Sequence, residues 1–219
     1  FLVLTGILTG LSVTTEYPTA LLGAILTLYA LWIISRLETT GRSKARFTGA
    51  ILLGLLIGGG ILLVYNLAAF GKPIYIPYEA YAKSGSPFPT FARGFLGLRW
   101  PGFSQLLGGL AAITIDPPLG ILYLRVEKWA LYACNPVLWL ALPGLGIMLW
   151  RSQWRAEGIV IVAMIVAYML FITNYGTSIY DWGGAIYLGS RHIVPLLPFL
   201  ALPLHFAALK LKWLFFPLF

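Results

Sequence analysis

The ionisable residues near the end of the chain are the group best suited to chemistry. Residues 180–200 read YDWGGAIYLGSRHIVPLLPFL and place Asp181, Trp182, Arg191 and His192 beside an apolar run. Arginine presents a planar fork of donors that suits bidentate binding of a phosphate. A carboxylate next to a flat aromatic ring suits polar, ring-shaped ligands such as sugars. The pattern therefore predicts a ligand site, and the alternative is an anchor of aromatic and charged side chains at a membrane interface.

The small and cyclic residues around this group favour access to a ligand. Gly183, Gly184 and Gly189 would let backbone amides approach a bound molecule closely. Pro195 and Pro198 follow at the start of the apolar run. We expect them to bend or open the helix there, which frees backbone carbonyl groups and makes room for a ligand.

Glu16 is the second candidate, in the segment TTEYPT between two apolar runs, where its carboxylate is held at the membrane surface. We expect Pro18 to start the second helix, where its missing N–H is harmless. Thr14 or Thr15 could accept hydrogen bonds from the free amides at that helix start. Two roles for Glu16 stay open: a salt bridge with Arg191 or another basic group, and direct contact with a ligand.

Several other chemistries are excluded by residue type and spacing. The single cysteine, Cys134, rules out an intrachain disulfide and a cysteine-based metal cluster. The two histidines, His192 and His205, are far apart, so no metal-ligand spacing occurs and we expect no metal or other resident cofactor. We expect His205 to be a hydrogen-bonded core residue. There is no glycine-rich phosphate loop and no string of intramembrane acids of the kind a proton pump needs.

These candidates must be positioned by membrane helices. Of the 219 residues, 59% are hydrophobic and only 10% are charged, whereas a soluble domain carries about 25% charged residues. The net charge of +8 would suggest nucleic acid in a soluble protein. In a membrane protein it reports topology and contact with anionic lipid headgroups instead, so membrane lipids are expected partners and nucleic acid is not.

The apolar runs predict an all-α polytopic bundle of about six spans, in one membrane-embedded domain covering residues 1–219. The spans cover about residues 1–14, 19–35, 47–65, 129–150, 158–173 and 192–209. The short loop 36–46 is basic and falls on the cytoplasmic side by the positive-inside rule. That orientation places a long loop, 66–128, outside the cytoplasm, with a short interfacial helix at 102–115. Both chain ends fall within apolar runs, so we expect the sequence to be part of a longer protein.

Two local features of these spans have expected roles. Gly58–Gly60 in the third span should permit close helix packing. Asn135–Pro136 and Pro143–Gly144 in the fourth span should kink that helix.

Four segments, TEYPTALL, YNLAAFGKP, NPVLWLALPGL and WGGAIYLGSRHIVPLLPFLALPL, resemble the C-terminal half of bacterial class C glycosyltransferases. That family takes sugars from polyprenyl-phosphate carriers and is related to protein mannosyltransferases and lipid A aminoarabinose transferases. The resemblance implies a multi-pass protein of the bacterial cytoplasmic membrane with an extracytoplasmic site for a lipid-linked sugar. It implies that Arg191 holds the carrier phosphate and that Asp181 and Glu16 line the sugar cavity. The family's catalytic acid lies in a first extracytoplasmic loop that this chain lacks, so catalytic residues stay unassigned and enzyme activity stays open.

A non-catalytic role is the main alternative. The chain could be a transmembrane subunit of a larger respiratory or photosynthetic complex, because its aromatic residues, 15% of the total, suit packing against helices, lipids or pigments. His192 or His205 could then ligate a pigment. A small transporter is disfavoured because no second set of broken helices occurs as a repeat.

Overall fold

The computed structural model describes residues 1–75, 107, 124–127, 130–133, 136–174, 191–211 and 213. These residues are helical except for one two-stranded hairpin and short connecting segments. The chain divides into two compact units, Phe1–Ala80 and Tyr81–Phe219, and each unit is described by itself. Asp181, Trp182, the glycines at 183, 184 and 189, and all of the predicted interfacial helix except Leu107 lie outside the described residues.

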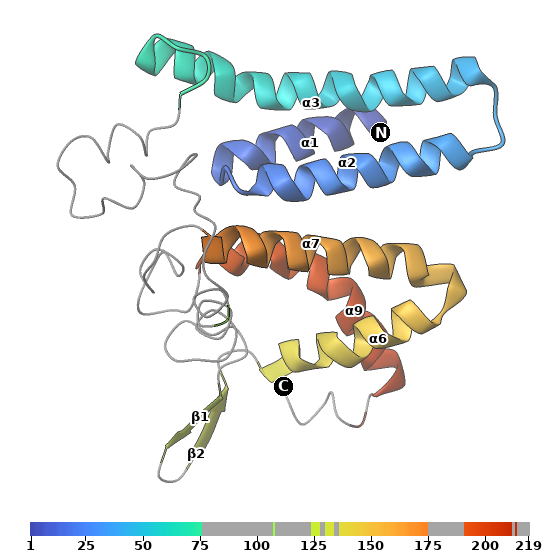
Figure 1. Cartoon of the computed structure of the whole chain (residues 1–219), viewed down its shortest axis with the longest axis vertical. Helices are drawn as coiled ribbons and strands as arrows, with labels where there is room; N and C mark the ends of the chain where they lie inside the picture. The colour runs from blue at the N-terminus through green and yellow to red at the C-terminus, as the bar shows by residue number, and fades with distance from the viewer. Residues whose placement is uncertain are drawn as a thin grey trace. The chain divides into compact units, whose positions relative to one another are not determined.

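The first unit consists of three apolar helices joined by short turns (Figure 1): α1 (Leu2–Thr15), α2 (Thr19–Arg36) and α3 (Gly41–Phe70). The third helix is longer than the predicted span 47–65. Thr40 caps its start, since the Thr40 hydroxyl accepts a hydrogen bond from the Ser43 amide at 3.3 Å. Its end is set by Gly71, whose φ of 68° gives the left-handed cap that glycine adopts at low cost.

Glycines bring α1 and α3 into close contact. Gly6 and Gly10 of α1 and Gly54 and Gly58 of α3 are buried, and in each helix the two glycines are four residues apart. This spacing aligns them on one helix face and lets two backbones approach directly. The expected packing role is confirmed for Gly58, whereas a methyl group at Gly59 or Gly60 would meet nothing within 4 Å.

The hydroxyl side chains of α1 bond to the backbone of their own helix. Thr5, Thr9, Ser12, Thr14 and Thr15 each donate to a carbonyl oxygen three or four residues earlier. A hydroxyl satisfied in this way can face an apolar surrounding without a large desolvation cost.

The described part of the second unit contains a hairpin that the sequence did not predict. Strands β1 (Leu124–Glu127) and β2 (Ala130–Ala133) are antiparallel, with Leu124 opposite Ala133. The predicted helical span 129–150 is therefore wrong over its first residues. Pro136 explains the later start, because proline disfavours helical geometry in the preceding residue but suits a first helical position.

The remaining elements form a helical cluster after Pro136 (Figure 1). They are η2 (Pro136–Leu140), α6 (Ala141–Trp150), η3 (Ser152–Trp154), α7 (Arg155–Asn174), η4 (Arg191–Leu196) and α9 (Leu197–Lys210). Pro136 therefore begins a helical segment and does not kink one.

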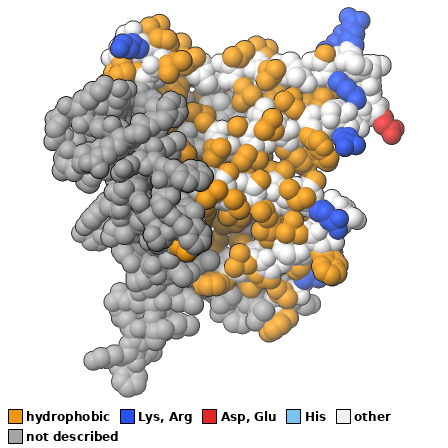
Figure 2. All heavy atoms as spheres, viewed as in Figure 1, with side chains coloured by type: hydrophobic (Ala, Val, Ile, Leu, Met, Phe, Trp, Pro, Cys, Tyr) orange, Lys and Arg blue, Asp and Glu red, His pale blue; other side chains and the backbone are white. Residues whose placement is uncertain are grey.

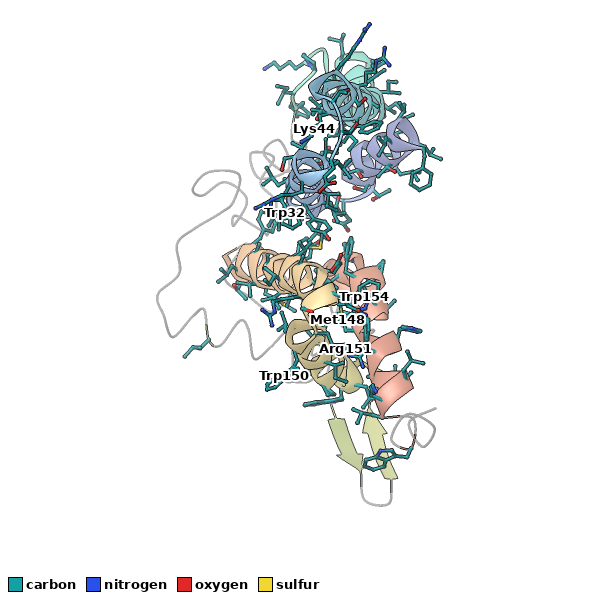
Figure 3. All side chains as sticks on the ribbon, turned by 90° about the vertical axis from the view of Figure 1, so that its right-hand side faces the viewer. Trp32, Lys44, Met148, Trp150, Arg151 and Trp154 are labelled. Carbon is teal, nitrogen blue, oxygen red and sulfur yellow. The ribbon has the colours of Figure 1, made fainter. Side chains whose placement is uncertain are left out.

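The core of this unit lies between α6, α7 and α9. Met148, Ile161 and Phe206 form a buried cluster, and the Trp154 ring meets Phe206 edge-on at 5.3 Å between centroids. Figure 3 shows Met148 and Trp154 among these helices. Gly144 gives α9 close access to α6, because a methyl group there would overlap the Pro203 carbonyl oxygen.

Among the described residues, three helical segments are long and apolar enough to cross a membrane: Thr19–Arg36, Gly41–Phe70 and Ser152–Thr173. The same residues include three shorter apolar helices, Leu2–Thr15, Val137–Trp150 and Val194–Lys210. At 1.5 Å per residue, the 14 residues of α1 extend about 21 Å, less than the roughly 30 Å of a bilayer core. In Figure 2, apolar side chains cover the visible helix surfaces, while Lys and Arg gather at helix ends. The described residues thus support a helical membrane protein, and the full count of six spans stays a prediction.

Candidate functional site

Glu16 lies in the three-residue turn between α1 and α2. Its backbone is extended, with φ of −149° and ψ of 114°, which ends α1. Its carbonyl oxygen accepts hydrogen bonds from the Thr19 amide at 3.0 Å and from the Thr19 hydroxyl at 2.7 Å. These bonds fix the turn tightly, so the Glu16 side chain is held at the end of two helices.

The carboxylate of Glu16 is half-buried, and it forms no ion pair or hydrogen bond with another described residue. The expected capping by Thr14 or Thr15 is wrong, because no side chain accepts a hydrogen bond at the start of α2. Both hydroxyls donate back into α1, to the carbonyl oxygens of Leu11 and Ser12. The carboxylate oxygens are therefore the acceptors that this turn leaves for a group from elsewhere.

The C-terminal end of α3 returns to this turn. Burial raises the pKa of the Tyr17 phenol above its ordinary value, and the nearby Tyr65 phenol adds to the shift. Tyr65 lies near the end of α3, and its influence on Tyr17 places the two phenols in the same region. Since Tyr17 follows Glu16 directly, this end of the first unit combines a carboxylate with two phenol groups.

Asn66 ties the chain that follows α3 to the helix. The side chain is only 3% exposed, and its Nδ2 atom donates to the carbonyl oxygens of Pro73 at 3.3 Å and Tyr75 at 3.2 Å. Among the described residues, its Oδ1 atom has no hydrogen-bond partner. Phe70 packs between Tyr65 and Tyr75, with ring centroids 6.2 and 4.3 Å away, so the same end carries a cluster of aromatic rings.

Arg191 and His192 open η4, a 3-10 segment that continues directly into α9. Pro195 lies within η4 and Pro198 at the start of α9. The expected distortion at these prolines is confirmed, because a regular α-helix begins only at Leu197. The side chains of Arg191 and His192 lie outside the described residues, so their meeting with Glu16 stays a prediction.

The expectation that His205 is a core residue is wrong. His205 is exposed, and on α9 the neighbouring Phe206 and Ala207 are the buried residues instead. Its ring touches the Phe206 ring edge-on at 5.8 Å. Within the described part of the chain, no three His, Cys, Asp or Glu side chains are arranged to hold a metal ion.

Three site residues escaped the sequence reasoning: Tyr17, Tyr65 and Asn66. The predicted third span ended at Tyr65, which assigned Asn66 to a loop and concealed its place in the last turns of α3. Tyrosines at both ends of apolar segments are typical of a membrane interface. A polar side chain inside such a helix marks a functional candidate. Together these two signals could have found the cluster.

This end of the first unit can supply hydrogen bonds to a polar ligand. The Glu16 carboxylate is an acceptor, and a tyrosine hydroxyl can both donate and accept. Aromatic rings beside them offer flat apolar surfaces. The fold and these residues define a helical bundle of the membrane type with a polar and aromatic end. Comparisons with protein-family models, with curated proteins and with solved structures found no match.

Proposed function

We propose that this protein is an integral membrane protein of the glycosyltransferase type, which binds a polyprenyl-phosphate-linked sugar at the extracytoplasmic ends of its helices. The observation that carries the proposal is the half-buried Glu16 carboxylate, which has no described partner and is held between α1 and the membrane-length helix α2. A carboxylate kept in this position without a cation is suited to accept hydrogen bonds from ligand hydroxyl groups.

The orientation in this proposal comes from charge. The opposite end of the first unit carries Arg36, Arg42, Lys44 and Arg46, with Glu38 as the sole acid among residues 36–46. By the positive-inside rule that end faces the cytoplasm. Glu16 then lies on the other side of the membrane, where the family resemblance expects the lipid-linked sugar.

The family resemblance gives Arg191 a role of its own, at the carrier phosphate. A guanidinium group would pair with the phosphate of the carrier and stabilise the negative charge that develops there as the sugar leaves. Transfer also needs a carboxylate to take a proton from the acceptor. No residue described above is assigned to that step, so the proposal for this chain is binding of the donor.

The test is binding of a polyprenyl-phosphate sugar to the purified chain in lipid nanodiscs. We expect Glu16→Gln and Arg191→Ala each to weaken binding about tenfold or more, since a hydrogen bond to a charged group contributes roughly 1.5–3 kcal/mol. Glu38→Gln is the matched control for Glu16→Gln, because Glu38 is exposed at the opposite end of the unit. Unchanged affinity in both site variants would contradict the proposal and favour the non-catalytic subunit.

A further inference from the structure

The last turns of α2 carry two stacked aromatic side chains, Tyr29 and Trp32, followed by the cation Arg36. The Tyr29 and Trp32 rings stack with centroids 5.9 Å apart and planes 17° from parallel. The Arg36 guanidinium lies over the Trp32 ring, with Cζ 5.7 Å from its centroid. Residues three and four apart share a helix face. Tyr29, Trp32 and Arg36 therefore lie along one side of α2, up to its last residue.

A second cation reaches the same helix end from α3. Lys44 Nζ donates to the Ser35 carbonyl oxygen at 2.7 Å. Figure 3 shows Trp32 on α2 and Lys44 on α3. An ammonium group has three donors, so this bond leaves two for another acceptor. Stacking on Trp32 likewise leaves the edge of the Arg36 guanidinium, with its N–H donors, open to an anion.

Among the described residues, no carboxylate balances the charge of this corner. Glu38 is the only acid between residues 17 and 75. Neither Arg36 nor Lys44 forms an ion pair with a described carboxylate. Both cations complement the negative end of the α2 dipole, but neutralising a helix end does not require two cations and an exposed indole.

An apolar surface continues directly from the cations. Leu28 and Trp32 are one turn apart on α2 and are 67% and 48% exposed. Arg36 follows one further turn along the same face. A cationic patch at the end of an exposed apolar strip matches the shape of a phospholipid, which has an anionic head and apolar chains.

We propose that the corner formed by Trp32, Arg36 and Lys44 binds an anionic phospholipid. Its phosphate contacts Arg36 and Lys44, and its acyl chains lie along Trp32 and Leu28. The inference rests on the proposed membrane placement, but it concerns the end of the bundle opposite Glu16 and does not depend on sugar binding.

The test uses the full chain in nanodiscs that contain brominated phosphatidylglycerol or brominated phosphatidylcholine. Bromine quenches tryptophan fluorescence at short range, and the difference between the wild type and Trp32→Phe isolates the Trp32 signal. One cation near a membrane surface contributes roughly 1 kcal/mol with an anionic lipid, so we expect a preference of about fivefold for phosphatidylglycerol at Trp32.

The matched variants are Arg36→Gln and Arg42→Gln, which remove one charge each from the same basic turn. We expect Arg36→Gln to abolish most of the preference and Arg42→Gln to keep most of it, because Arg36 lies over the Trp32 ring and Arg42 does not. If both variants lose the preference for phosphatidylglycerol equally, the preference comes from the overall positive charge of this region, and the proposed site is wrong. Equal quenching by the two lipids would overturn anionic selection but leave membrane placement intact. Quenching by neither lipid would overturn both the membrane placement of Trp32 and the inference.

Discussion

A methyl group added at Gly6 would lie 2.9 Å from the Cα atom of Gly54, and one added at Gly54 would lie 2.8 Å from the Cα atom of Gly6. The two backbones therefore meet with no side chain between them. One turn further along, methyl groups at Gly10 and Gly58 would also meet the backbone of the other helix, at Gly59 N (2.6 Å) and Leu11 N (2.9 Å). Such contact gives close van der Waals packing where the hydrophobic effect is weak, as between helices in lipid.

Neighbouring glycines of α3 allow a strict test of this contact. Gly58→Ala would place a methyl group against the Ile7 carbonyl oxygen, whereas Gly59→Ala would meet nothing within 4 Å. We expect Gly58→Ala to lower the free energy of unfolding by about 1–3 kcal/mol, the usual cost of overpacking. Gly59→Ala should be neutral or slightly stabilising, because alanine favours helix. Equal effects in detergent unfolding would contradict the α1–α3 packing.

The same comparison is available in the second unit. Gly144→Ala would overlap the Pro203 carbonyl oxygen, and Gly146→Ala, on the same helix, would meet nothing within 4 Å. We expect only Gly144→Ala to lower the midpoint of thermal unfolding, since it alone forces α6 and α9 apart. A variant at Gly146 that is as unstable as the one at Gly144 would show that the α6–α9 contact is not what limits stability.

The helical class of the fold could be read from composition, but helix limits could not. Runs of apolar residues mark segments that avoid water, whereas the ends depend on single caps such as Thr40 and Gly71. The predicted fourth span shows the same limit, because the apolar stretch continues across Pro136 while helical geometry does not. Hydropathy indicates which segments are buried away from water, but it does not determine where a helix begins or ends.

The candidate site could be predicted only in part. Glu16 was identified because an acid between two apolar runs is costly unless it has a role. Tyr17 and Tyr65 are far apart in sequence, and their proximity depends on α3 returning beside α1. His205 was assigned wrongly because an apolar sequence does not specify which helix face meets the core. That face is set here by the contacts of Pro203 and Phe206.

The raised pKa of the Tyr17 phenol predicts how the stability of the fold depends on pH. Its pKa in the folded state is raised above 10.0, mainly by burial. The fold then favours the protonated phenol, so its contribution to stability is complete below pH 10 and is lost as pH rises through the higher folded pKa. We expect stability to fall above pH 10 in the wild type and to fall less in Tyr17→Phe. Tyr65→Phe should leave most of the shift, because burial is the larger cause; spectrophotometric titration of the phenols checks this.

The hydrogen bonds of Asn66 predict that this side chain holds the segment 71–75 against α3. Its Nδ2 group donates to the carbonyl oxygens of Pro73 and Tyr75, and its side chain is buried. Asn66→Asp keeps the size but replaces the donor by an oxygen that repels both carbonyls. We expect Asn66→Asp to release residues 71–75 and to cost at least the roughly 1–3 kcal/mol of an unsatisfied buried group.

Limited proteolysis and hydrogen exchange at residues 71–75 measure this release. Asn66→Leu is the control variant. It removes the Nδ2 donor without placing a repelling oxygen beside the two carbonyl groups, and it keeps a side chain of similar size. We expect it to release the segment less than Asn66→Asp does, since loss of a donor is less costly than replacing it with a buried acceptor or charge. Protection at 71–75 that stays at the wild-type level in Asn66→Asp would show that the two hydrogen bonds do not hold this segment, and that the aromatic contact of Phe70 with Tyr75 is sufficient.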